Sequence, residues 1–145
     1  MEVRVQERAL DPWQEVQAYQ SQHAELLGKF GATTIFVGTM RDFNQGKDVT
    51  EMRLEHYPGM TESHLQKVTS EALEKWDVLD VLVIHRVGLM RQGDPIVLVA
   101  AWSAHRADAF AACRYVIDEL KTRAPFWKQE SIPGGETRWV EPEQE

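Results

Sequence analysis

The hydrophobic and polar positions of the chain follow two periods, and the period of two marks the strands. "EVRVQ" (2–6) and "TEMRLEHY" (50–57) alternate apolar with polar residues, which is typical of strands with one buried face. "GATTIFVGTM" (31–40) is rich in β-branched residues, which favour extended backbone. "VLDVLVIHRVG" (78–88) and "PIVLVAAW" (95–102) are apolar runs of strand length. Each of these five segments is predicted to be a strand.

Turn-forming residues predict how the strands are connected. "LMRQGD" (89–94) joins the two apolar strands in a hairpin-like connection, and "RDFNQGKD" (41–48) is expected to be a mobile loop. "FWKQESI" (126–132) and "TRWVE" (137–141), separated by "PGGE", predict a final hairpin. The last residues, 141–145, are expected to form a solvated tail.

A spacing of three to four residues between apolar side chains predicts a first helix. This helix begins with Asp11 as N-cap and Pro12 at its first position, and Gly28 stops it. Its inner face is expected to carry Trp13, Val16, Tyr19, His23 and Leu26.

The same spacing predicts two further helices. Thr61 is the predicted N-cap of the second and Ser103 that of the third, which should end near Ala124 because Pro125 disfavours helical backbone before it. The inner faces are expected to carry Leu65, Val68, Ala72 and Trp76 in the second helix, and Phe110, Cys113, Ile117 and Leu120 in the third. Three helices among about seven strands, with hairpins as well as crossovers, indicate one α+β domain with a mixed sheet over residues 1–145.

Charge and cysteine content narrow the class of protein. The 16 Lys and Arg against 23 Asp and Glu give a formal net charge of -7, which argues against a general nucleic-acid or membrane binder. An anionic ligand must therefore be attracted by a local pocket. Cys113 is the only cysteine and reads as a core residue, so no disulfide forms within the chain, and a cytoplasmic location is expected. The five histidines show no metal-ligand spacing, so we predict no metal and no cofactor.

Positive charge nevertheless gathers in "KTRAPFWK", residues 121–128. Lys121 and Arg123 fall in the predicted last turn of a helix, where cations offset the helix dipole. That effect does not explain Lys128, because this residue lies outside the predicted helix, after Pro125 and next to Trp127. The aromatic residues either shield a lysine stem or line a dry pocket.

Other candidate residues also have structural alternatives. His105 and Arg106, in the first turn of the third helix, form either an anion site or a solvated turn. Arg41 alone reads as part of a surface loop. His56 and His85 are expected to have structural roles.

These motifs taken in order resemble one family. "FVGTMRDFN", "LEHYPGMTE", "IHRVG", "SAHR" and "LKTRAPFWK" are similar to the catalytic (large) subunit of molybdopterin synthase, from about residue 30 to residue 141. The resemblance implies an α/β-hammerhead-like fold. It also implies conversion of cyclic pyranopterin monophosphate (precursor Z) to molybdopterin, with sulfur delivered by the C-terminal Gly-Gly thiocarboxylate of a small ubiquitin-like subunit. The implied assembly is a heterotetramer built on a homodimer of large subunits.

The resemblance also assigns candidate site residues. It implies that Lys121 is the central catalytic lysine and Lys128 its companion. Whether Lys121 acts as proton carrier, nucleophile or electrostatic support stays open. The residues expected to bind the substrate are Arg41, His105, Arg106, Phe36 and Arg138. These cations are expected to converge in one shielded pocket.

Two other functions remain open at this point. One is a non-catalytic module that binds a partner ending in Gly-Gly, which needs a groove for the tail but no second anion site. The other is a phosphate-handling enzyme that works alone, such as a cyclic phosphodiesterase.

Overall fold

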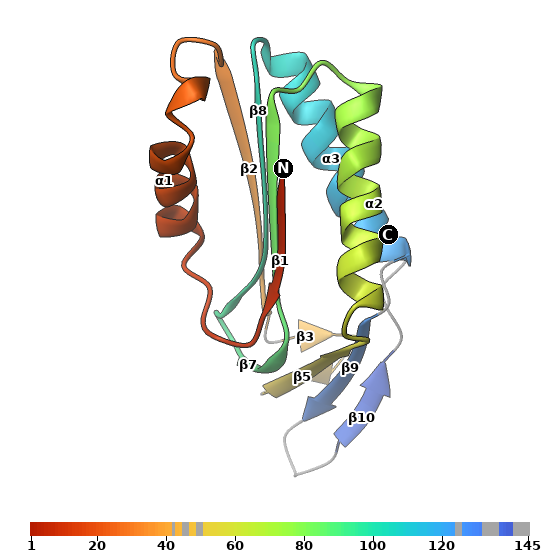
Figure 1. The fold of residues 1–145 in the computed structure, drawn as a ribbon. Helices are drawn as coiled ribbons and strands as arrows, with labels where there is room; N and C mark the ends of the chain where they lie inside the picture. The colour runs from red at the N-terminus through yellow and green to blue at the C-terminus, as the bar shows by residue number, and fades with distance from the viewer. Residues whose placement is uncertain (42, 45–46, 49–50, 124–125, 132–136, 141–145) are drawn as a thin grey trace.

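The computed structural model shows two four-stranded sheets, a two-stranded hairpin and three main helices (Figure 1). It describes residues 1–41, 43–44, 47–48, 51–123, 126–131 and 137–140, with side chains over 1–41, 51–123 and at 126. The predicted tail, 141–145, lies outside the described residues.

The first sheet is mixed and has the strand order β1-β6-β8-β2. Its strands are β1 (Glu2–Gln6), β6 (Asp80–Arg86), β8 (Pro95–Ser103) and β2 (Ala32–Thr39). β1 runs parallel to β6, whereas the pairs β6–β8 and β8–β2 are antiparallel. The predicted α+β class with a mixed sheet is therefore confirmed, and β2 forms one edge of this sheet.

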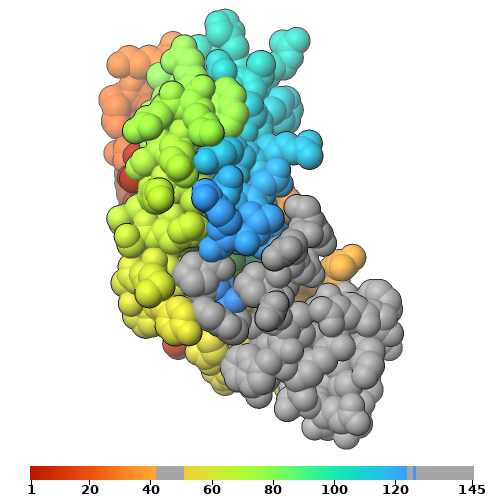
Figure 2. Space-filling view, turned by 90° about the vertical axis from the view of Figure 1, so that its right-hand side faces the viewer, coloured from red at the N-terminus to blue at the C-terminus, as the bar shows by residue number. Residues whose placement is uncertain are grey.

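Helices cover both faces of the first sheet. α2 (Met60–Lys75) and α3 (Arg106–Arg123) pack side by side on one face, as Figures 1 and 2 show. α1 (Pro12–Gln22) and a short 3-10 helix, η1 (Ala24–Leu26), cover the other face. Side chains along β6 alternate between the two faces of the sheet. Val81 and Val83 belong to the core under α2 and α3, whereas Leu82 and Ile84 belong to the core under α1.

The second sheet is antiparallel and has the order β10-β9-β5-β7. Its strands are β10 (Thr137–Val140), β9 (Phe126–Ser131), β5 (Glu51–His56) and β7 (Gly88–Arg91). The predicted C-terminal hairpin is confirmed as the β9–β10 pair. Residues 89–94 were predicted to be only a connection between two strands. Residues 89–91 instead belong to β7, which pairs with β5 in the second sheet.

A small hairpin replaces part of the loop predicted over residues 41–48. β3 (Phe43–Asn44) pairs with β4 (Lys47–Asp48) in antiparallel fashion. Asp42, Gln45 and Gly46 lie outside the described residues. The sequence predicted a loop here because strands of two residues are too short for a periodic signal.

Two aromatic residues were assigned to inner helix faces incorrectly. Trp13 and Phe110 are each 64% exposed. The other predicted inner residues of α3 that reach the core are Cys113 and Leu120, with Ile117 half-buried beside them. An aromatic at helical spacing can sit at the margin of the buried stripe, where the sequence does not reveal whether it is covered.

The predicted caps of α2 and α3 also differ from the structure. α2 begins after Gly59, whose backbone N–H donates to the Glu62 carboxylate at 3.0 Å, and Thr61 is fully buried within the first turn. Ser103 is a fully buried residue at the end of β8, and its hydroxyl donates to the carbonyl of His105. Asp11, in contrast, caps α1 as predicted, by accepting from the Gln14 N–H.

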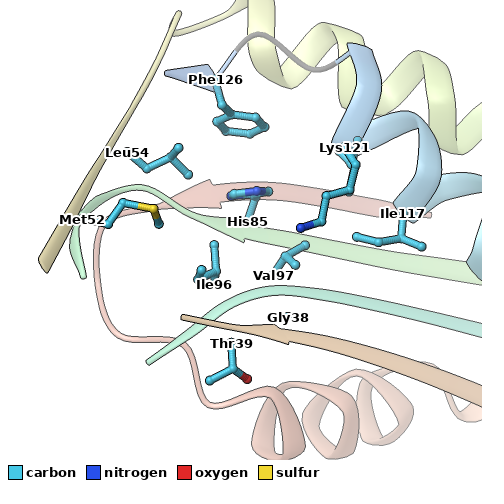
Figure 3. Close-up of a pocket in the computed structure, with 11 residues that line it drawn as sticks. Gly38, Thr39, Met52, Leu54, His85, Ile96, Val97, Ile117, Lys121 and Phe126 are labelled. Carbon is cyan, nitrogen blue, oxygen red and sulfur yellow. The ribbon is translucent and has the colours of Figure 1, made fainter. Parts of the chain in front are cut away.

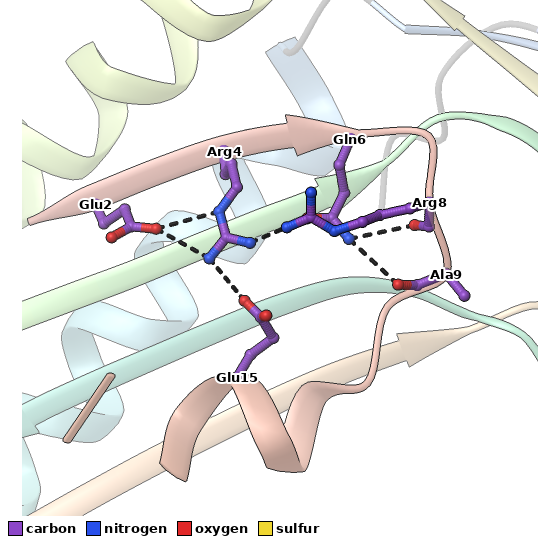
Figure 4. A network of polar contacts seen from close by, with 6 residues as sticks. All are labelled: Glu2, Arg4, Gln6, Arg8, Ala9 and Glu15. Carbon is purple, nitrogen blue, oxygen red and sulfur yellow. Dashed lines mark hydrogen bonds and ion pairs between the residues drawn. The ribbon is translucent and has the colours of Figure 1, made fainter. Parts of the chain in front are cut away.

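A polar network fixes α1 beside the first sheet (Figure 4). The Arg4 guanidinium on β1 donates to Glu2 at 2.9 Å and to Glu15 on α1 at 2.6 Å. It also donates to the side chain of Gln6, which in turn donates to the carbonyls of Arg8 and Ala9. One arginine therefore links the first strand to the first turn of α1.

Candidate functional site

A cavity of about 100 Å³ lies where the end of α3 meets both sheets (Figure 3). Its walls come from β2, β5, β6, β8, β9 and α3, and most of them are apolar. The described residues that line it are Gly38, Thr39, Met52, Leu54, His85, Ile96, Val97, Ile117, Leu120, Lys121 and Phe126. The fold thus brings together segments that are far apart in the sequence.

Lys121 enters this cavity from the last turn of α3. The side chain is half-buried and extends from the helix toward His85 (Figure 3). Its neighbour in sequence, Leu120, is buried in the core and fixes the rotation of the helix. Among the described lining residues, Lys121 is the only lysine or arginine, and no carboxylate is present. A cation in such surroundings interacts strongly with an incoming anion, because the local dielectric is low.

Arg123 belongs to a different environment from Lys121. Its Nη2 lies 3.6 Å from Oε1 of Glu71 on α2, and its Nε pairs with Glu119. Glu71 also accepts a hydrogen bond of 3.2 Å from the hydroxyl of Tyr115. The positive cluster read from the sequence is therefore divided: Arg123 ties the end of α3 to α2, and Lys121 faces the cavity.

His85 lies in the cavity wall, although the sequence favoured a purely structural role. It is 8% exposed, and its ring stacks on Phe126 with centroids 4.0 Å apart. Its Nδ1 lies 2.9 Å from the carbonyl oxygen of Arg86. The available signal was the alternation along β6, because His85 shares a face with Val81 and Val83, which α2 and α3 cover.

His105 and Arg106 lie at the opposite end of α3 from Lys121. Both are exposed, and the helix begins at Arg106. The 18 residues of α3 span about 27 Å at 1.5 Å per residue. Within one chain the structure therefore does not bring Arg106 to the Lys121 cavity, contrary to the expected convergence of all these cations.

The other candidate residues lie at varied distances from the cavity. Arg41 is exposed and follows β2 two residues beyond Thr39, a lining residue. Phe36, half-buried on β2, lines a second, shallower hollow between β2 and α3. Ile117 lines both the cavity and this hollow.

Lys128 and Arg138 are described through their backbone alone. Lys128 lies on β9, directly opposite Leu54 of β5, a residue that lines the cavity. Arg138 lies on β10, opposite Glu130. Their roles stay predictions, because their side chains lie outside the described part of the chain.

Cys113 has the environment of a core thiol. It is buried, its thiol donates to the carbonyl of Val99 at 3.6 Å, and burial raises the pKa of that thiol. A protonated, enclosed thiol is a poor nucleophile. Within the described residues, no three His, Cys, Asp or Glu side chains are grouped as metal ligands would be, and no helix has the length and apolarity to cross a membrane.

Comparison with known proteins places this geometry in a family. The MoaE protein family matches residues 5–123. The molybdopterin synthase catalytic subunit of Pseudomonas aeruginosa is 52% identical over 141 residues, which cover 97% of this chain and 91% of that protein. The corresponding subunit of Escherichia coli is 50% identical over 111 residues, covering 77% and 73%.

Solved structures agree with the sequence relatives. The molybdopterin biosynthesis MoaE protein of Burkholderia ambifaria superposes with a TM-score of 0.80 at 46% identity, covering 97% of this chain and 88% of that one. Molybdopterin synthase from Staphylococcus aureus gives 0.81 at 28% identity, covering 94% and 95%. The α+β architecture is thus that of a molybdopterin biosynthesis protein. The chain belongs to the MoaE family, that of the molybdopterin synthase catalytic subunits.

Proposed function

We propose that this chain is the catalytic subunit of molybdopterin synthase and acts as a sulfurtransferase. It converts precursor Z to molybdopterin with sulfur from the C-terminal thiocarboxylate of a small ubiquitin-like subunit. The single observation that carries this proposal is that Lys121, in a chain of this family, extends into a cavity with apolar walls. A cytoplasmic location is part of the same proposal, and the free thiol of Cys113 supports it.

The cavity suits a slender, negatively charged chain end. Its volume of about 100 Å³ and its walls of Met52, Leu54 and Phe126 leave room for a tail without side chains, such as Gly-Gly. Lys121 supplies a basic group at the wall of this cavity. Preorganised charge of this kind stabilises a negative transition state without reorganisation. Each transfer forms a carbon–sulfur bond to the pterin and breaks the carbon–sulfur bond of the thiocarboxylate. Water supplies the oxygen that replaces sulfur on the acyl carbon, so the carrier is left with a carboxylate.

The sulfur must come from another molecule. Cys113 is the only cysteine of the chain, and it is buried against Val99 with a raised pKa. Neither a persulfide relay nor a second thiol is available within the sequence. A thiocarboxylate on a small partner subunit supplies what the chain itself lacks.

The substrate phosphate requires cations that Lys121 alone does not provide. His105 and Arg106 are exposed at the first turn of α3, where backbone N–H groups also favour an anion. Because α3 spans about 27 Å, these residues can serve a Lys121 cavity only if they come from a second copy of the chain. We therefore propose that each site of the expected homodimer combines residues of both copies.

The hollow between β2 and α3 supports this arrangement. Its α3 residues are Phe110, Cys113, Arg114 and Ile117. Cys113 and Arg114 lie midway between Arg106 and Lys121 in the sequence. A two-fold axis perpendicular to α3 at this point would set Arg106 of one copy beside Lys121 of the other. The exposed Phe110 and Ile35, together with the open edge of β2, offer a self-complementary contact surface.

The remaining site residues stay part of the proposal. Arg41, which follows the lining residue Thr39, is suited to meet the phosphate at the cavity rim. Phe36 borders the hollow on the path between the two copies. Lys128, as companion of Lys121, is supported by its register opposite Leu54, and Arg138 is a further candidate at the substrate.

Reconstitution tests the proposed function directly. The purified chain is incubated with precursor Z and thiocarboxylated small subunit, and molybdopterin is detected after oxidation to a fluorescent derivative. Product that requires both the chain and the thiocarboxylate supports the proposal. Capture of the small subunit without product would instead support a binding module, and consumption of precursor Z without the small subunit would support an enzyme that works alone.

A further inference from the structure

We propose that His85 is a positioning residue that orients the ammonium group of Lys121 by accepting a hydrogen bond at Nε2. The inference rests on the proposed function for its catalytic consequence, but its geometry can be tested on the chain alone. His85 and Lys121 come from β6 and α3, and both line the same cavity. Figure 3 shows the Lys121 side chain extending toward the imidazole ring.

The backbone selects the tautomer of His85. Its Nδ1 lies 2.9 Å from the carbonyl oxygen of Arg86, and a carbonyl can only accept a hydrogen bond. Nδ1 must therefore carry the proton and donate. In the neutral ring this leaves Nε2 with a lone pair, so Nε2 is an acceptor.

Packing holds the ring in one orientation. The imidazole is 8% exposed and stacks on Phe126, with centroids 4.0 Å apart and planes inclined by 21°. The backbone of His85 is fixed on both sides, because β6 pairs with β1 and with β8 at this residue. An acceptor held this rigidly can fix the direction of a flexible lysine side chain, whose ordering otherwise costs conformational entropy.

A neutral acceptor has an advantage over a carboxylate at this position. A carboxylate beside Lys121 would cancel the charge that attracts an anionic chain end. The imidazole satisfies one N–H of the ammonium and leaves its unit charge intact. Among the described lining residues the remaining polar side chain is that of Thr39, and none is acidic. The composition of the wall therefore suits a lysine that must be both fixed and positive.

The first test uses NMR of the chain without substrate or partner. Two-bond 1H–15N correlations at pH 8 report the tautomer of each histidine. We expect His85 in the Nδ1–H form, and we expect its Nε2 resonance to shift in Lys121→Met while the resonances of His56 stay in place. An Nε2–H tautomer of His85, or an Nε2 resonance that does not shift in Lys121→Met, would overturn the proposal. This result would not depend on which reaction the enzyme catalyses.

The second test compares two replacements in the reconstituted synthase at saturating substrate. His85→Phe keeps a ring to stack on Phe126 but removes the acceptor, and His85→Gln restores an acceptor oxygen near the position of Nε2. We expect His85→Phe to slow turnover about 10- to 100-fold, the cost of losing one hydrogen bond to a charged group. His85→Gln should recover a substantial part of that loss, and His56→Gln should behave as wild type.

The outcomes of this comparison separate the two roles of the ring. Wild-type turnover by His85→Phe, or a glutamine variant no faster than the phenylalanine variant, contradicts the acceptor role and leaves packing as the function of the ring. If His85→Phe does not fold, which its thermal unfolding shows, the NMR test decides. An inactive wild-type enzyme would refute the proposed function and not this geometry.

Discussion

The hydroxyl of Tyr19 donates a hydrogen bond of 2.8 Å to the buried carboxylate of Asp80, joining α1 to the start of β6. The Asp80 carboxylate also accepts from the N–H of Val81 and pairs with the amino group of Met1. Burial, together with Asp80, raises the pKa of Tyr19 well above its usual value, so the phenol keeps its proton at every physiological pH. The tyrosine ring also stacks on Trp102 in the core under α1.

Removing this hydroxyl tests how α1 is held. Tyr19→Phe leaves the buried Asp80 carboxylate without one donor, which should lower the free energy of unfolding by about 1–3 kcal/mol. Tyr115→Phe is the matched control, because its partner Glu71 is partly exposed, and it should cost less. Urea unfolding measures both variants. Equal losses in the two would contradict the role assigned to the buried carboxylate.

His64 provides a pH-sensitive element beneath the end of α3. Its Nε2 is buried, and no hydrogen-bond partner for it is present in the described part of the chain. Burial, reinforced by the positive charges of Arg123 and Lys67, lowers the pKa of His64 from its usual 6.5, against the opposing effect of Glu119 and Glu71. The folded state therefore holds the neutral form more firmly than the unfolded state does.

The sign of the resulting pH dependence follows from linkage. Below pH 6.5 the unfolded chain binds a proton at His64 before the folded chain does, so stability is lost as the pH falls through the folded pKa. We expect the free energy of unfolding to fall less between pH 7.5 and pH 5.0 in His64→Gln than in wild type. Equal losses in the two proteins would show that His64 does not contribute.

Mixed dimers test whether two copies share each site. At precursor Z concentrations below the wild-type KM, Lys121→Ala and Arg106→Ala should each be inactive or strongly impaired alone. After subunit exchange a mixed dimer regains one intact site, so an equimolar mixture should recover about a quarter of wild-type activity. Arg106→Ala mixed with His105→Ala is the control, because no site in that dimer is intact. If neither mixture recovers activity, each site is formed by the residues of one chain.

Arg106 should act on substrate binding more than on the chemical step. Arg106→Ala removes a cation proposed to meet the phosphate, which should raise the KM for precursor Z about 10- to 100-fold, as expected for a charge-assisted hydrogen bond. Arg91→Ala is a suitable control, because this exposed arginine pairs with Glu51 on the second sheet. Steady-state kinetics measure both. An unchanged KM in Arg106→Ala would remove the residue from the phosphate site.

Local patterns in the sequence predicted most of the fold. The alternation in β5, the apolar runs of β6 and β8 and the Asp11–Pro12 start of α1 all concern neighbours in the chain. The switch of β7 to the second sheet could not be predicted, because it depends on pairing with β5, far away in sequence. The exposure of Phe110 was missed for a related reason: apolar spacing identifies a face but not what covers it.

The candidate site was predicted in part. The resemblance to the family singled out Lys121. The structure shows that this residue lines a cavity together with His85 and an apolar wall, which only tertiary packing brings together. The expectation that Arg106 and Lys121 converge within one chain overlooked the length of α3, which separates them. That separation could have been calculated from the predicted helix, whereas a contribution from a second copy leaves no local pattern.

The most direct measurement of the central claim is single-turnover formation of molybdopterin by Lys121→Ala beside Thr122→Ala. Thr122, one residue away, is exposed and donates its hydroxyl to the carbonyl of Asp118, so it controls for damage to the helix end. We expect Lys121→Ala to lose at least about 10²-fold in rate with its unfolding transition unchanged, and Thr122→Ala to retain wild-type turnover. Turnover near the wild-type rate by Lys121→Ala would contradict the assignment of this cavity as the site of sulfur transfer.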